Sequence, residues 1–264
     1  MNLGISTACF YPMYLEQAIE HLIAHEVKTM ELFVNTFSET QRDFYCSLKH
    51  RIEDGGVRLL SLHPFTSLLE SILFFSEYDR RFEDGIEFYK QTYFDMMNQL
   101  EIPLMVFHGA KIENKCSEEL YFEHYAALRQ AGKEYGIHIA QENVAHCRSR
   151  SLDFLCRMKE YLHDDVSFVL DVKQAVQGGE DPIEMVQTLG KQIVHTHLSD
   201  HGQKTDHPQW DCLPVGEGQF DFARFFSVLK EQGGCSSGVI ELYHDSYKNY
   251  EQIYHSLKEL EKYQ

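Results

Sequence analysis

Short apolar segments alternate with longer amphipathic segments along the whole chain, and this alternation most narrows the choice of folds. Short runs rich in β-branched and aromatic residues indicate strands, and apolar residues at helical spacing indicate helices. The strand-like segments are Leu3–Thr7, Thr29–Phe33, Leu59–His63, Leu104–His108, His138–Val144, Ser167–Val172, Ile193–Leu198 and Gly238–Tyr243.

Helical patterns fill the gaps between these strands. The segment at Ile183–Leu189 follows Asp181-Pro182, an N-cap and a first-turn proline. The other expected helices are Leu15–Glu26, Ser117–Tyr135, Asp221–Gln232 and Asp245–Tyr263.

Eight strands alternating with helices over 264 residues predict an α/β fold, a (β/α)8 TIM barrel that forms a single domain over residues 1–264. A doubly wound open sheet is the rival architecture. It usually carries a glycine-rich phosphate turn after the first strand, and the segment Ser6–Phe10 has no glycine.

Charge and cysteine content limit the kinds of partner that the chain is expected to bind and the cellular compartment in which it is expected. Lys and Arg number 24 and Asp and Glu number 41, which gives a net charge of −17 and disfavours nucleic acid as a partner. Seven cysteines without a C-x-x-C motif fit free thiols in a reducing cytoplasm. Neither a signal peptide nor an apolar run of membrane-spanning length is recognisable, so no membrane partner is expected.

Acidic and histidine side chains stand at the ends of four different expected strands. In a (β/α)8 barrel the active site lies at the carboxyl ends of the strands. Converging carboxylates repel one another unless a cation sits among them. The mixed oxygen and nitrogen set suits one divalent metal ion, namely Mn²⁺, Zn²⁺, Mg²⁺ or Co²⁺. The expected ligands are Glu142, Asp171, His197 and Glu241.

Other polar residues near the strand ends have two or more interpretations. His63 and His108 could bond to backbone, donate to substrate or hold a second metal. Arg148 could anchor an anionic substrate group, although a solvated helix start is the favoured interpretation. Lys173 could point into the barrel mouth and contact substrate, or pair with a neighbouring acid. When each residue is considered alone, a structural role is favoured for Glu31, His195 and Asp200. A substrate contact by Asp200 stays open.

Five motifs together resemble a known family. QENV at Glu142, LDV at Asp171, HTHLSD at His197, VGEGQFDF over Val215–Phe222 and IEL at Glu241 are similar to motifs of the xylose isomerase-like TIM barrels. The likeness extends over essentially the whole chain and points to the branch of sugar-phosphate isomerases/epimerases, related to endonuclease IV.

The resemblance implies roles for individual residues. Glu142, Asp171, His197 and Glu241 match the family's single-metal site, and the two glutamates match the pair that exchanges a substrate proton. His63 and His108 match positions that hold a further zinc in endonuclease IV, with Glu142 as the bridge.

Two departures concern the third metal site of endonuclease IV. Gln174 stands where the family often has a histidine, and Leu213 stands where endonuclease IV has the histidine of an Asp-x-His pair. Trinuclear phosphodiester chemistry is therefore disfavoured. Gln174 also replaces a typical substrate contact of the epimerases and is itself a candidate for substrate binding.

The sequence thus favours a divalent-metal-dependent sugar or sugar-phosphate isomerase/epimerase. Its catalytic residues would be Glu142 and Glu241, and its partner a small sugar or sugar phosphate. An endonuclease IV-like hydrolase, a keto-sugar or inositol dehydratase and a non-catalytic sugar-binding barrel remain as alternatives. The sequence leaves open the substrate and its phosphorylation, the identity and number of metal ions, and whether the chain forms a homodimer.

Overall fold

The fold is a closed barrel of parallel strands. The structure is a computed structural model of the chain that describes all residues except 164, 203–211 and 264. Neighbours in the sequence are neighbours in the barrel, and β8 closes it against β1. This order confirms the TIM barrel and excludes the doubly wound sheet. The strands are β1 (Asn2–Ser6), β2 (Thr29–Phe33), β3 (Arg58–His63), β4 (Leu104–Phe107), β5 (His138–Glu142), β6 (Phe168–Asp171), β7 (Ile193–Leu198) and β8 (Ser237–Ile240).

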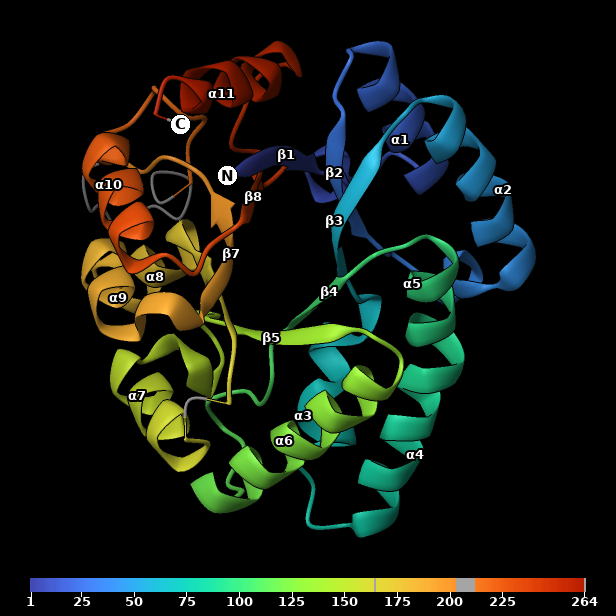
Figure 1. Cartoon of the computed structure of the whole chain (residues 1–264), viewed down its shortest axis with the longest axis vertical. Helices are drawn as coiled ribbons and strands as arrows, with labels where there is room; N and C mark the ends of the chain where they lie inside the picture. Colours follow the sequence, from blue (N-terminus) through green and yellow to red (C-terminus); the bar gives the residue numbers. More distant parts are fainter. Residues whose placement is uncertain (164, 203–211, 264) are drawn as a thin grey trace.

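The helices surround the barrel on its outside (Figure 1). None of the described helices is long and apolar enough to cross a membrane. The α-helices are α1 (Leu15–Ala24), α2 (Arg42–Asp54), α3 (Glu70–Leu73), α4 (Asp79–Tyr89), α5 (Asp95–Gln99), α6 (Glu118–Glu134), α7 (Leu152–Tyr161), α8 (Val172–Gly178), α9 (Pro182–Leu189), α10 (Phe222–Gln232) and α11 (Glu251–Glu261).

Side-chain caps explain where several helices begin. Ser117 Oγ accepts the Leu120 N–H at 3.1 Å before α6, and Asp181 accepts the Ile183 N–H at 2.8 Å before α9. The last helix departs from expectation, because α11 begins at Glu251 and not at Asp245. The preceding segment forms a turn, in which the Tyr247 hydroxyl donates to the Cys9 carbonyl.

The barrel interior changes from apolar to polar along its axis. Leu104, Val106, Ala140 and Val169 form a buried apolar cluster between the strands. Two residues further along β5 and β6 stand Glu142 and Asp171, which lie on the same faces as Ala140 and Val169 because strand side chains alternate. The apolar cluster therefore fills the barrel below a layer of buried charged groups.

Candidate metal and active site

Four buried side chains converge at the carboxyl end of the barrel. Glu142 and Asp171 are the last residues of β5 and β6, His197 lies in β7, and Glu241 directly follows β8. Each offers one ligand atom, and these atoms all lie within 4.8 Å of one another. The structure therefore brings together the four residues expected from the sequence.

His197 shows that this cluster suits a cation. Its Nδ1 atom lies 3.1 Å from Glu142 Oε1, 3.3 Å from Glu241 Oε2 and 3.5 Å from Asp171 Oδ2. One ring nitrogen carries at most one proton, so it cannot satisfy three carboxylates. Three carboxylate oxygens and one imidazole nitrogen facing one point form a donor set typical of a divalent metal.

Local hydrogen bonds orient Asp171 toward this point. Asp171 is the N-cap of α8, and its Oδ1 accepts the Gln174 N–H at 2.8 Å. The Asn143 side chain accepts the Asp171 N–H at 2.7 Å and donates to the Asp171 carbonyl at 3.0 Å. Because Oδ1 is used by the helix, Oδ2 is the oxygen that faces the other ligands.

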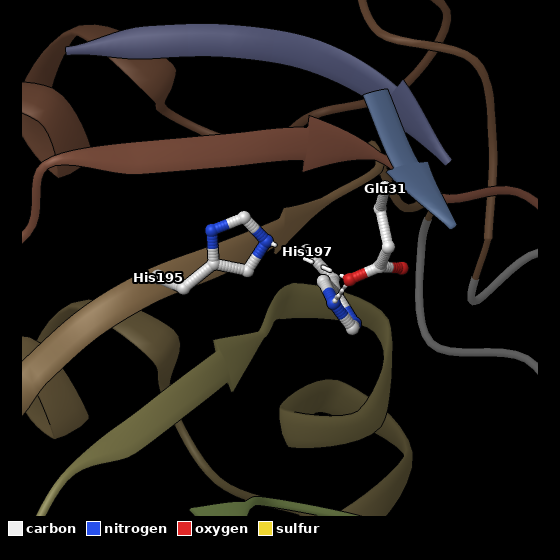
Figure 2. A group of neighbouring side chains, drawn as sticks. All are labelled: Glu31, His195 and His197. Carbon is white, nitrogen blue, oxygen red and sulfur yellow. Dashed lines mark hydrogen bonds and ion pairs between the residues drawn. The ribbon is translucent and has the colours of Figure 1, made fainter. Parts of the chain in front are cut away.

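Glu31 supports His197 from the opposite side. Figure 2 shows the Glu31 carboxylate beside the His197 ring, and Glu31 Oε2 lies 3.1 Å from His197 Nε2. The hydroxyls of Ser6 and Ser61 donate to the same carboxylate at 2.9 and 2.7 Å. A carboxylate that holds the second nitrogen of a histidine fixes the ring for metal binding.

The sequence did not assign this role to Glu31. Taken alone as a strand-end acid, Glu31 is expected to be structural, and the same expectation applies to His195. His195 lies deeper in the barrel, where its Nδ1 is 2.7 Å from Ser237 Oγ. A signal was present, because Glu31 interrupts the otherwise apolar strand TMELF at a position that must be buried.

Lys173 places a positively charged side chain beside two of these acids. Its side chain is 2% exposed, and its ammonium donates to Asp171 Oδ2 and to Glu241 Oε2. It also lies 5.4 Å from the centre of the Tyr243 ring. Lys173 therefore pairs with neighbouring acids and also lines the cavity, while a contact with substrate stays a prediction.

His63 and His108 form a second cluster with Glu142. The Nε2 atoms of the two histidines are 2.7 Å apart, and His108 Nε2 lies 2.8 Å from Glu142 Oε2. Among the described residues, Glu142 Oε2 and both histidine Nδ1 atoms are buried without a hydrogen bond of good geometry. Two imidazoles and one carboxylate oxygen facing one another fit a second metal as well as substrate contacts.

Glu70 fixes the backbone directly after β4, where His108 lies. Its Oε2 accepts the backbone N–H groups of His108 and Gly109 at 2.8 and 2.6 Å, and the Tyr89 hydroxyl donates to Oε1 at 3.0 Å. Burial raises the pKa of Glu70 to about 8. Glu70 comes from α3, so the segment between β3 and β4 contributes to the site from outside the barrel.

The charges around the four converging side chains are strongly coupled. Burial opposes ionisation of Glu142, but His108 and His197 outweigh it and hold its pKa well below the usual range. Burial likewise opposes ionisation of Glu241, and Lys173 and His197 outweigh it and lower its pKa. Burial disfavours a charged His197, yet Glu31 and the neighbouring glutamates raise its pKa well above the ordinary value. These glutamates are therefore ionised at neutral pH.

A cavity of about 720 Å³ opens above these residues. Its polar lining includes His63, His108, Glu142, Lys173 and Glu241. Aromatic and aliphatic side chains line other parts of it, including Tyr11, Phe33, Phe65, Leu68 and Tyr243. A small polar molecule with an apolar face fits such a lining.

The remaining sequence candidates lie at different distances from this cavity. Gln174 lines it, while its side chain accepts the Ala145 N–H at 2.9 Å and donates to the Tyr243 hydroxyl at 3.2 Å. Arg148 is not among the lining residues, and its guanidinium packs over the Tyr121 and Phe154 rings.

Asp200 and Leu213 belong to the loop that follows β7. The Asp200 carboxylate accepts backbone N–H groups of Gly216, Gly218 and Phe220 at 2.9 to 3.0 Å, which organises the glycine-rich segment. Leu213 pairs with Asp200 through two backbone hydrogen bonds. Asp211, the acid of the incomplete Asp-x-His pair, lies outside the described residues.

Comparison with known proteins identifies the family. The model of the xylose isomerase-like TIM barrel family matches residues 19–263, so the chain belongs to that family. No curated protein sequence matches the chain.

Solved structures share the fold at low sequence identity. A D-tagatose 3-epimerase-like protein superimposes with a TM-score of 0.79 at 20% identity, covering 100% of this chain and 97% of the other. An IolI protein with a bound zinc atom gives 0.77 at 20% identity, covering 100% and 96%. The D-psicose 3-epimerase of Clostridium cellulolyticum H10, solved with D-tagatose, gives 0.74 at 14% identity, covering 100% and 98%.

Proposed function

We propose that the protein is a divalent-metal-dependent isomerase or epimerase of a sugar or sugar phosphate. The observation that carries this proposal is the convergence of four buried ligand atoms within 4.8 Å of one another, in a site that opens on a cavity. Membership of the xylose isomerase-like family and the likeness to structures described as epimerases support it.

Glu142, Asp171, His197 and Glu241 would hold the metal ion. A divalent ion held there would withdraw electrons from a substrate carbonyl and make the neighbouring C–H more acidic. The three carboxylates and one imidazole are compatible with Mn²⁺, Zn²⁺, Mg²⁺ or Co²⁺.

The two glutamates would move the proton. Glu142 lies at the end of β5, and Glu241 lies directly after β8. These two strands are not neighbours in the barrel. A substrate carbon placed between them has one glutamate on each side. One carboxylate would remove the proton, and the other would return a proton to the opposite face. His63 and His108 would donate to substrate oxygens.

The charge of the cavity favours a sugar without phosphate. Within the described part of the lining, Lys173 is the one lysine or arginine, and it is already paired with Asp171 and Glu241. Phosphate groups are usually held by free lysine or arginine side chains. Arg148, for which an anion anchor is the less favoured of two interpretations, packs on aromatic rings outside this lining.

The experiment that tests the function has two stages. Elemental analysis of protein purified without chelator measures the metal content per chain, and about one divalent ion is expected. The metal-loaded protein is then incubated with a panel of ketopentoses and ketohexoses in D₂O. NMR should detect deuterium at the carbon next to the carbonyl together with the epimer or isomer.

Matched variants separate chemistry from folding. Glu142→Gln and Glu241→Gln should lower turnover by about 10²- to 10⁴-fold, as expected for loss of an acid–base group. Glu53→Gln, which changes an exposed glutamate of α2, is the control and should keep the wild-type rate. Wild-type turnover by Glu142→Gln would refute the proton-transfer mechanism.

A metal-dependent phosphodiester hydrolase of the endonuclease IV type is the second candidate. The cluster of His63, His108 and Glu142 favours it, because a second metal there would give a multinuclear site. Two or more zinc ions per chain and incision of an abasic DNA duplex would establish it.

Loss of water from a ketose in the D₂O experiment would instead indicate a dehydratase. Thermal stabilisation by a sugar without turnover would indicate a non-catalytic binding barrel.

A further inference from the structure

Lys173 occupies an unusual place for a lysine. It lies in the first turn of α8, two residues after Asp171, and its side chain is 2% exposed. Lysine is rarely buried unless it is paired. Here the ammonium is paired with Asp171 and Glu241, which come from β6 and from the end of β8.

The oxygens that bind Lys173 are also the oxygens that face the metal ligands. Lys173 contacts Asp171 Oδ2 and Glu241 Oε2. The same two atoms lie 3.5 and 3.3 Å from His197 Nδ1, the nitrogen at the centre of the four-residue cluster. A metal ion bound by His197 and these carboxylates would use oxygens that the ammonium already holds.

The other oxygen of Asp171 cannot relieve this conflict. Asp171 Oδ1 accepts the Gln174 N–H at 2.8 Å as the cap of α8. A rotation of the carboxylate that kept Oδ2 on Lys173 and gave Oδ1 to a metal would break that cap. The ammonium and the metal would therefore both contact Asp171 Oδ2.

We propose that Lys173 competes with the divalent metal ion for Asp171 Oδ2 and Glu241 Oε2 and thereby weakens metal binding. This inference rests on the proposed metal dependence of the enzyme. Without metal, the ammonium neutralises part of the repulsion between the two carboxylates. Metal uptake weakens or separates at least one of these ion pairs, because the ion and the ammonium share an oxygen and repel each other, so the metal binds less tightly than it would without Lys173.

The surrounding charge explains why competition lowers the affinity without abolishing it. Glu31, Glu142, Asp171 and Glu241 are four acids around Lys173 and His197, so the cluster keeps a negative charge after both cations are counted. A divalent ion is still attracted. The displaced ammonium has room to move, because Lys173 lines the cavity and its stem has four rotatable bonds.

The test is a metal titration of chelator-treated protein by isothermal titration calorimetry with Mn²⁺ and, separately, Zn²⁺. Lys173→Met removes the ammonium and keeps an unbranched side chain. It should bind either ion about tenfold or more tightly than wild type, since its carboxylates lack a competing cation. Lys173→Arg keeps the positive charge and should stay within a few-fold of wild type. Lys111→Met removes an exposed lysine and is the control for net charge.

The outcomes separate this inference from the proposed function. If wild type binds metal and Lys173→Met binds it equally or more weakly, the competition is refuted and the metal-dependent function stands. If neither wild type nor the variant binds metal, the metal-dependent function itself fails, and the competition with it. Circular dichroism checks that Lys173→Met is folded, and Lys173→Gln takes its place if it is not.

Discussion

The Glu31 carboxylate lies directly behind His197, with 3.1 Å between Glu31 Oε2 and His197 Nε2, while His197 Nδ1 faces the converging carboxylates. A ring held at Nε2 by an acceptor keeps its Nε2 proton, so Nδ1 is the nitrogen that is available to a metal. Burial opposes a charged Glu31, yet His197 outweighs it and lowers the pKa of Glu31 to about 2. The support is therefore an anion throughout the physiological pH range.

Replacing Glu31 should weaken metal binding although Glu31 is not one of the four ligands. Glu31→Ala leaves His197 free to rotate and removes the carboxylate that increases its basicity. We expect a loss of metal affinity of about 10- to 100-fold, measured by calorimetric titration. Glu31→Gln keeps an acceptor for Nε2 and should lose less. Ser6→Ala removes only one hydrogen bond to the carboxylate and is the matched control. Unchanged affinity in Glu31→Ala would show that the ring is held by packing alone.

Glu70 predicts a fall in stability as the pH rises. Its pKa is about 8 in the folded protein, against an ordinary value of 4.5, because it is buried. Between these values the folded chain keeps a proton that the unfolded chain has released. The contribution of Glu70 proton binding to the free energy of unfolding is thus fully present below about pH 4.5 and lost by about pH 8. It amounts to a few kcal/mol.

Glu70→Gln resembles the protonated carboxyl and should remove this dependence. Its amide oxygen can still accept the His108 and Gly109 N–H groups. Urea unfolding at pH 5, 6.5 and 8 measures the free energy of unfolding of wild type and variant. The free energy of unfolding of Glu70→Gln should increase relative to that of wild type as the pH rises. Glu53→Gln, on the surface of α2, should follow wild type. A pH-independent difference between Glu70→Gln and wild type would contradict the assigned pKa.

The backbone next to His108 depends on the absence of a side chain. Gly109 has a φ of +83°, and a Cβ there would lie 1.9 Å from the Tyr121 hydroxyl oxygen. Gly109→Ala should therefore lose more stability than the roughly 1–2 kcal/mol that left-handed geometry alone costs. Gly136→Ala is the matched control, since Gly136 has a φ of +72° and open space around it. Equal losses in denaturant unfolding would mean that Tyr121 moves aside freely.

The four expected ligands could be predicted from the sequence because each depends on a local pattern. Glu142 and Asp171 end apolar runs, and alternation along a strand places them on the same face as Ala140 and Val169. Closure of a parallel barrel then brings all strand ends to one mouth, whatever the details of packing. The segment at Asp245 was less predictable, since a contact of Tyr247 with the distant Cys9 accompanies its turn.

The partners of these ligands could not be predicted, because they depend on distances across the barrel. Glu31 and His197 are 166 residues apart and meet only when β2 and β7 point into the same interior. The pairing of β2 with β3 also shifts its register between Met30 and Glu31. Lys173 had two reasonable interpretations for the same reason. Its pairing with Glu241 depends on the closure of β8 onto the barrel, which no local pattern around Lys173 shows.

Metal removal should lower the thermal stability of the protein. Four buried acids around two cations repel one another, and a ligand that binds only the folded chain stabilises it by mass action. At a free metal concentration 100 times Kd the gain is about 2.7 kcal/mol, which for a chain of this size corresponds to a Tm change of a few degrees. Differential scanning calorimetry with added Mn²⁺ and with excess chelator measures the change. His197→Gln, which removes the imidazole at the centre of the cluster, should abolish most of the difference, whereas Glu53→Gln should retain it. A wild-type Tm that is identical with metal and with chelator would mean that the four residues form an ion-pair network with Lys173 and hold no metal.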